Sequence, residues 1–257
     1  MRRHNLAALM LLALLPAGAA HAGLVVESTS SVNGPQTLTV ADERVRIEPA
    51  RAGAPAMLFD AGRGRLVLLN RPASQYNVIT VERLDALEKR VTEQRERMRR
   101  RIEETEGEDR QRLQRRLERL PRVDGPAAIR IERGGERTRI NGFDCEQASA
   151  TEAGEDTHRL CISRVSELGL TETTTATLRA LFDFLARMRN LLGSGTAPFD
   201  ARVLQATLGQ TNAFPVRIER SVDGSNWTVR EIETADIPAE RFEVPADFTE
   251  GARLGGE

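Results

Sequence analysis

Histidine, cysteine, lysine and aromatic residues are all scarce in this chain of 257 residues. It holds three histidines, two cysteines, one tryptophan and one tyrosine, and Lys89 is its only lysine. Zinc sites usually need several imidazoles or thiolates, and a catalytic triad needs a histidine held between a nucleophile and an acid. Phosphate-binding loops and Schiff-base sites need a lysine, whereas Lys89 lies in a charged helical segment. We therefore expect a non-enzymatic protein with no catalytic residue, no metal site and no cofactor.

The chain also has no apolar run long enough to cross a membrane. Its longest run, residues 6–15, is shorter than the roughly 20 residues that a spanning helix needs. The run follows Arg2 and Arg3 and precedes the small-residue sequence Ala20-His21-Ala22, which is the pattern of a cleavable secretory signal. We expect a signal peptide over residues 1–22 and a secreted, periplasmic chain that starts near Gly23 and has no transmembrane segment.

The charge balance does not indicate a nucleic acid as partner. The chain has 37 basic and 38 acidic residues, and removal of Arg2 and Arg3 leaves 35 basic against the same 38 acidic residues. A net charge of about −3 gives the secreted chain no general attraction to nucleic acid. His158 is then the only histidine left. Its spacing puts it on a strand face with Leu160 and Ile162, so we interpret it as a structural residue.

Alternation of apolar and polar residues predicts short strands between residues 24 and 80. Apolar residues recur two positions apart, which places them on one face of a strand, and sequences such as Asn33-Gly34-Pro35 separate the runs as turns. The apolar pairs are Leu24 and Val26, Leu38 and Val40, Val45 and Ile47, Met57 and Phe59, Leu66 and Leu68, and Tyr76 and Val78.

From residue 81 to residue 120 the chain is dominated by arginine and glutamate with a sparse apolar stripe of helical period. The stripe breaks at Glu106-Gly107-Glu108, which predicts two antiparallel helices, a charged helical hairpin of imperfect coiled-coil type. Its acidic tip is interpreted as solvated. The arginine run over residues 95–101 could meet anionic lipid head groups or an acidic partner, but glutamates lie beside it, and we interpret this face as solvated too.

Strand periodicity returns after Pro121 at residues 129–131, around residues 140–145 and at residues 160–162. A broad apolar face predicts a helix over residues 173–192, which Gly193-Ser194-Gly195 would end and which is wide enough to cover a sheet. Further strands are expected at residues 214–218, 227–229 and 242–244, with Pro245 ending the last one. The whole pattern favours an α+β fold.

Cys145 and Cys161 flank a polar segment, residues 147–157, which we expect to be a loop between two strands. In a secreted protein, two cysteines at this spacing favour a structural disulfide. A redox-active pair is the alternative, but the spacing is not the Cys-x-x-Cys that lowers a thiol pKa.

Several short motifs together resemble a family of exported bacterial domains of unknown function, which is similar in fold to the lipoprotein carriers LolA and LolB. The resemblance implies a curved antiparallel sheet, an incomplete barrel covered by helices, as a single LolA-like domain over residues 23–250. The charged hairpin 81–120 would be inserted in it, and residues 251–257 would form a flexible tail. The motifs are Val45-Arg46-Ile47, Phe59-Asp60, Leu68-Leu69, Tyr76 with its following helix, Ile140-Asn141-Gly142-Phe143-Asp144-Cys145, Phe214-Pro215-Val216-Arg217 and Phe242-Glu243-Val244-Pro245.

The same resemblance implies that the helix over residues 173–192 covers an apolar cavity into which Phe182, Leu185 and Met188 point, and it implies no catalytic residue. Our leading hypothesis is a periplasmic binding protein for a lipid or another apolar ligand. The alternative is a scaffolding protein that docks a protein partner through the hairpin 81–120. A hydrolase that uses two carboxylates is a third hypothesis, for which the sequence identifies no pair.

Overall fold

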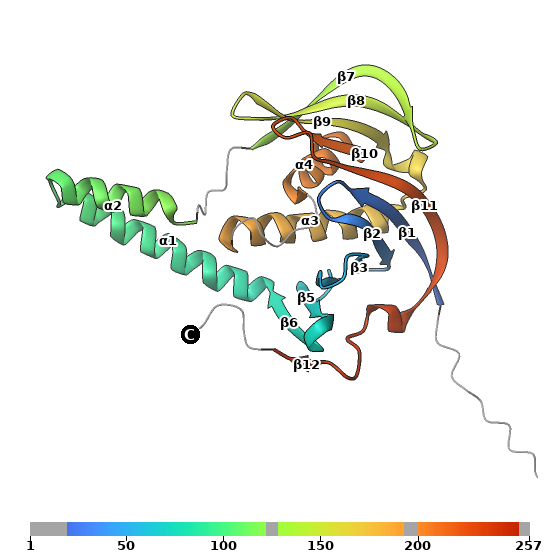
Figure 1. Ribbon diagram of the computed structural model, residues 1–257, viewed down its shortest axis with the longest axis horizontal. Helices are drawn as coiled ribbons and strands as arrows, with labels where there is room; N and C mark the ends of the chain where they lie inside the picture. The colour runs from blue at the N-terminus through green and yellow to red at the C-terminus, as the bar shows by residue number, and fades with distance from the viewer. Residues whose placement is uncertain (1–19, 122–127, 193–199, 252–257) are drawn as a thin grey trace, which may run out of the picture.

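The computed structural model describes residues 20–121, 128–192 and 200–251 of the chain (Figure 1). Within these residues the fold is mixed α+β, as the sequence predicts. Of the other predictions, the leader before Ala20, the helix stop at Gly193-Ser194-Gly195 and the tail beyond Gly251 lie outside the described residues. Ala20, His21 and Ala22, the end of the expected leader, are the first residues of a strand.

The strands predicted over residues 24–80 are confirmed. Each hairpin turn lies where the apolar alternation breaks, and apolar side chains such as Val26, Val40 and Val45 point into the core and are at most 2% exposed. The six strands are β1 (Ala20–Ser30), β2 (Gly34–Ala41), β3 (Arg44–Pro49), β4 (Ala56–Asp60), β5 (Arg65–Asn70) and β6 (Gln75–Thr80).

The second half of the chain contributes β7 (Ile129–Ile140), β8 (Phe143–Glu152), β9 (Glu155–Arg164), β10 (Ala213–Arg220), β11 (Asn226–Pro238) and β12 (Thr249–Glu250). The loop expected over residues 147–157 is wrong, because both strands run on to a two-residue turn at Ala153-Gly154. Both turn residues have positive φ angles, 54° and 86°, which suit a tight hairpin. Asn141-Gly142 makes a similar turn and divides the expected strand 140–145 between β7 and β8.

All twelve strands form one open sheet, in the order β12-β6-β5-β4-β3-β2-β1-β11-β10-β9-β8-β7. Pairing of β1 with β11 joins the two halves of the chain, and among the described strands only the pairing of β12 with β6 is parallel. β12 and β7 are the two edges, so the sheet formed by the described residues does not close.

The described helices are α1 (Val81–Glu103), α2 (Gly107–Arg119), α3 (Glu172–Leu192) and α4 (Ala201–Thr211), with short 3₁₀ turns η1 (Arg71–Ala73), η2 (Val165–Leu168) and η3 (Ala239–Phe242). Side chains cap three of the described helix starts: Thr80 accepts from the backbone N–H of Arg83, Thr171 from that of Thr174, and Asp200 from that of Arg202. In the part of the chain that the structure describes, none of the helices is long and apolar enough to span a membrane.

The main core lies between the sheet and α3. Figure 1 shows α3 and α4 on one side of the sheet, between its two ends. Phe182, Leu185 and Met188 have no exposed surface and belong to the same core cluster as Val45 on β3 and Val216 on β10. The apolar face predicted for residues 173–192 therefore covers a sheet. The sequence analysis did not predict α4, whose buried Leu204 and Leu208 extend this layer.

A second apolar cluster lies on the opposite face of the sheet. Leu58 on β4 and Leu69 on β5 are buried there beneath Val244 and Phe248 from the C-terminal segment. The strand expected at residues 242–244 is wrong: β11 ends at Pro238, a 3₁₀ turn follows, and the chain then crosses the outer face. The apolar residues of this segment are therefore not strand residues; they pack onto the outer face of the sheet.

The helices α1 and α2 extend away from the sheet (Figure 1). Arg187 on α3 pairs with Asp85 and Glu88 and so ties the first turns of α1 to the body. Further out, the guanidinium of Arg95 on α1 donates to three backbone carbonyls at the end of α2, those of Leu117, Leu120 and Pro121, each at 3.2 Å.

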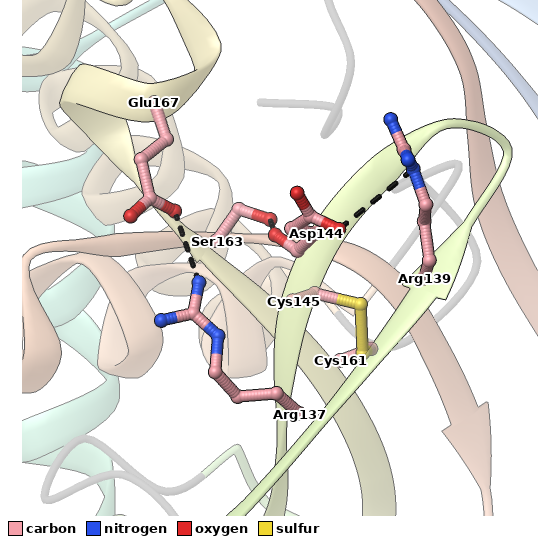
Figure 2. Close-up of a disulfide and its surroundings, with 7 residues drawn as sticks. All are labelled: Arg137, Arg139, Asp144, Cys145, Cys161, Ser163 and Glu167. Atoms are coloured by element: carbon pink, nitrogen blue, oxygen red, sulfur yellow. Dashed lines mark hydrogen bonds and ion pairs between the residues drawn. A yellow bond between two sulfur atoms is a disulfide. The ribbon is translucent and has the colours of Figure 1, made fainter.

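Cys145 on β8 and Cys161 on β9 are at disulfide distance, with 2.05 Å between the sulfur atoms (Figure 2). Ser163 donates a hydrogen bond of 2.6 Å to the backbone carbonyl of Asp144 beside them. The pair therefore ties together the two strands of one hairpin.

We expect Leu185→Ala to lower the free energy of unfolding by about 2–5 kcal/mol, because it leaves a cavity in the core beneath α3. Urea unfolding measures this. Leu192→Ala on the same helix is the matched control: that side chain is 47% exposed, so its loss should cost no more than about 0.5 kcal/mol. Equal costs for the two variants would contradict the described packing of α3.

Reduction of the disulfide should lower the free energy of unfolding by roughly 3 kcal/mol, since the bond closes a loop of about 15 residues in the unfolded chain. Urea unfolding with and without dithiothreitol gives the difference. A Cys145→Ala/Cys161→Ala variant serves as control and should not respond to the reductant. If the wild-type protein also fails to respond, the cysteines are not paired.

Candidate functional site

A cleft of about 950 Å³ lies where three hairpin ends meet the α3–α4 helices. We call it the mouth cleft. It is bounded by the β1–β2, β8–β9 and β10–β11 hairpins and by Arg189 near the end of α3 and Asp200 at the start of α4. The lining residues are Ser30, Val32, Asn33, Glu152, Glu155, Asp156, Thr157, His158, Arg189, Asp200, Arg202, Ile218, Arg220, Ser221, Val222, Ser225, Asn226 and Trp227.

The polar floor of the mouth cleft is a buried histidine and carboxylate. His158 projects from the inner face of β9, in line with Leu160 and Ile162 as predicted, and its Nε2 lies 3.5 Å from Oδ2 of Asp200. Each of the two side chains is only 7% exposed. Buried charges need partners, so the surroundings of Asp200 decide whether its carboxylate can be ionised.

Asp200 has these partners from two helices. Arg189 on α3 donates to Oδ1 at 2.9 Å, and the backbone N–H of Arg202 donates to the same oxygen at 3.3 Å as the cap of α4. Arg202 itself makes two hydrogen bonds, of 2.9 and 3.0 Å, to the carboxylate of Glu152 at the end of β8. The floor is thus an ionic network that joins α3, α4 and the β8–β9 hairpin.

The pKa values of His158 and Asp200 are both lowered, for different reasons. Burial by itself would raise the pKa of Asp200, but the attraction of Arg189 and the other cationic neighbours outweighs it, and the pKa lies below 3.8. Burial lowers the pKa of His158 below 6.5; the nearby arginines act in the same direction, and Asp200 opposes them. At neutral pH the floor therefore holds an ionised Asp200 beside a neutral His158.

This pair resembles the base and orienting acid of a hydrolase, but the hydroxyl next to it is already engaged. Oγ1 of Thr157 lies 3.1 Å from Nδ1 of His158 and donates at 3.0 Å to the backbone carbonyl of Ala150. A hydroxyl whose proton is held by a carbonyl is not activated by the histidine. Within the residues described, no cluster of three or more histidine, cysteine or acidic residues could hold a metal ion. The arrangement is suited to binding a polar group.

Apolar residues line the rim and one wall of the same cleft. Among the described residues, the large apolar side chains that are exposed are Val32, Val222 and Leu192, at 64%, 85% and 47%. The first two line the mouth cleft, and Leu192 ends α3 one turn beyond Arg189. Exposed apolar groups gathered at one place are typical of an interaction site. Trp227, the single tryptophan, forms part of the wall and donates to the hydroxyl of Ser28 at 3.1 Å.

The predicted cavity residues lie elsewhere. Phe182, Leu185 and Met188 are fully buried in the main core and do not line the mouth cleft. They also do not line a second, smaller cleft of about 250 Å³ between the β7–β9 strands and the end of α4. The structure thus places these three residues together under the sheet, with the mouth cleft at a separate position.

Sequence reasoning found one member of the floor, His158, and missed its partners. One usable signal was present: Asp200 precedes the apolar residues Val203, Leu204 and Leu208 at helical spacing, which is the pattern of a capped helix start. The pairing of Asp200 with His158 carries no local signal, because the two residues belong to different elements.

Acidification should destabilise the protein through His158. Below about pH 6.5 the unfolded chain binds a proton on this histidine that the folded chain resists, so the free energy of unfolding falls as the pH falls. We expect His158→Gln to reduce the fall measured by urea unfolding between about pH 7.5 and pH 5.5. The other histidines are common to both proteins. An unchanged pH dependence in the variant would show that His158 is not held neutral by burial.

Comparison with known proteins gives a family but no activity. No curated protein matches the chain. A family model described as "Domain of unknown function (DUF4412)" matches residues 115–248, more than half of the chain. The match includes α3, α4 and the strands that carry His158 and Trp227. The chain therefore belongs to the DUF4412 family, a domain of unknown function.

Proposed function

We propose that this chain is an exported, non-enzymatic binding protein that takes an apolar or amphipathic ligand, such as a lipid, in the mouth cleft. The observation that carries the proposal is the combination, in one cleft of about 950 Å³, of an exposed apolar rim with a buried ionic floor. Ligand sites are typically about 300–1,000 Å³ and combine apolar walls with a few fixed polar groups.

The two parts of the cleft suit the two ends of an amphipathic molecule. Val32, Val222 and Ile218 offer apolar surface, and burying a valine-sized side chain is worth about 1.5–3 kcal/mol. Arg189 and Arg202 offer N–H groups, and each is held in position by a carboxylate, that of the buried Asp200 and that of the half-buried Glu152. Groups fixed by such a network lose little freedom on binding, which favours affinity.

The ligand is placed at the mouth and not around Phe182, Leu185 and Met188, because those side chains already pack against the sheet. A cavity there, as in the predicted LolA-like arrangement, would need α3 to move away from the strands. The secretory leader expected over residues 1–22 supports the periplasm as the place where binding occurs.

The scaffolding role remains the second candidate. The observation that favours it is that α2 has no buried residue and extends with α1 away from the body. In this case the hairpin 81–120 would dock a partner and the mouth cleft would be incidental.

Trp227 provides a direct test, because the only tryptophan of the chain lines the proposed site. We expect its fluorescence to change on titration with palmitate, an amphiphile with an anionic head. The double variant Val32→Asp/Val222→Asp should weaken palmitate binding by at least about tenfold, because charged side chains replace the apolar rim.

Ala52→Asp/Thr173→Asp is the matched control, since it also adds two charges, at exposed residues in the β3–β4 loop and in the first turn of α3, and should bind palmitate as the wild type does. Absence of a saturable fluorescence change in the wild type, together with no effect of a neutral long-chain alcohol, would overturn the proposal and favour the scaffolding role. Equal weakening in the rim variant and the control would also contradict it.

A further inference from the structure

Four arginines of α2 lie on one exposed face of the helix. They are Arg112, Arg115, Arg116 and Arg119, and all four are exposed. Their spacing of three, four and seven residues places them side by side along the helix. The half-buried Leu113 and Leu117 occupy a different face. We call the four residues the arginine stripe.

The stripe is electrostatically unfavourable within the protein. Like charges three or four positions apart destabilise a helix, and the stripe contains several such pairs. Among the described residues, ion pairing neutralises only Arg112, through Asp109. Glu118 is the single acidic residue between positions 110 and 119, and it makes no ion pair within the described part of the chain. An external anion would relieve this repulsion.

The form of the stripe favours a surface of phosphate groups over a folded protein partner. A protein interface has an apolar core that is depleted of charge, whereas Leu113 and Leu117, half-buried apolar residues of α2, lie on a different face from the stripe. Guanidinium groups bind phosphate oxygens with two parallel hydrogen bonds and need no apolar contact to do so. Clusters of arginine or lysine are attracted to anionic membrane surfaces.

The placement of the stripe makes it accessible to a surface. α1 and α2 extend together away from the body. Arg95 on α1 holds the end of α2 against α1 through hydrogen bonds to backbone carbonyls. The opposing feature is the acidic tip, residues 103–109, which an anionic surface would repel. The contact must therefore be made by the side of the hairpin, with the tip directed away.

We propose that the arginine stripe docks the protein side-on to a membrane surface rich in anionic phospholipid head groups. This inference is independent of the mouth cleft and goes beyond the proposed ligand. If the cleft binds a lipid, the stripe would hold the protein at the membrane that donates or accepts that lipid.

Co-sedimentation with vesicles tests the docking. The probes are vesicles of phosphatidylcholine with about 30 mol % phosphatidylglycerol and vesicles of phosphatidylcholine alone. We expect the full chain to bind the anionic vesicles at about 50 mM salt and to be released at about 500 mM salt, where the Debye length is short. Replacing all four stripe arginines by glutamine should weaken the binding by at least about tenfold.

The matched control replaces four exposed arginines of the body, Arg51, Arg63, Arg139 and Arg159, by glutamine, which changes the net charge equally. It should keep most of the binding. A third variant, Glu103→Gln/Glu104→Gln, removes two charges of the acidic tip and should bind the anionic vesicles more tightly than the wild type. Circular dichroism checks that each variant keeps its helices.

Several outcomes would overturn the proposal. Equal loss in the stripe and body variants would mean that only net charge matters. Equal binding to neutral vesicles would assign the contact to exposed apolar residues such as Val32 and Val222. No vesicle binding together with binding to DNA or to an acidic protein would assign the stripe to another partner. None of these outcomes affects the result of the palmitate titration followed by Trp227 fluorescence. Either proposal can therefore be overturned while the other stands.

Discussion

The packing of α3 against the sheet is the interaction on which the rest of the structure depends. An open sheet with two free edges has an apolar face that must be covered, and α3 provides the cover with a continuous buried face. Val45 from the first half of the chain and Val216 from the second share one core with Phe182 and Leu185. This common core is why two sets of hairpins, joined through β1 and β11, behave as one unit around a single helix.

The mouth cleft lies where α3 ends and α4 begins. Arg189 lies near the end of α3, and Asp200 begins α4 and caps it, so the two helices meet at an ion pair. β9 brings His158 to the same point, and Arg202 binds Glu152 from the neighbouring hairpin. The charges that hold the helices to the hairpins are therefore the charges that face the cleft. The side chains that join the helices to the hairpins are thus the same ones to which the proposed function assigns ligand binding.

Strand prediction succeeded where apolar residues recur two positions apart between clear turns, as in β1 to β6, and this held even in β4 and β5, which are apolar on both faces. In β8 and β9 it found only the parts around residues 143–145 and 160–162, because residues such as Gln147, Ser149 and Thr151 are typical of a loop when the sequence is considered alone. Val244 shows the opposite error, since an apolar residue that packs from above a sheet gives the same signal as a strand residue. The disulfide partners could be named from the sequence because the chain holds only two cysteines. The mouth cleft could be predicted only in part, because its residues come from seven elements that meet in space.

The most direct test of the central claim, that the cleft holds an apolar or amphipathic ligand, is native mass spectrometry of the purified protein before and after organic extraction. The account predicts a discrete bound mass that extraction removes and that is absent from the Val32→Asp/Val222→Asp variant. A mass equal to that of the polypeptide with its disulfide, unchanged by extraction, would contradict it.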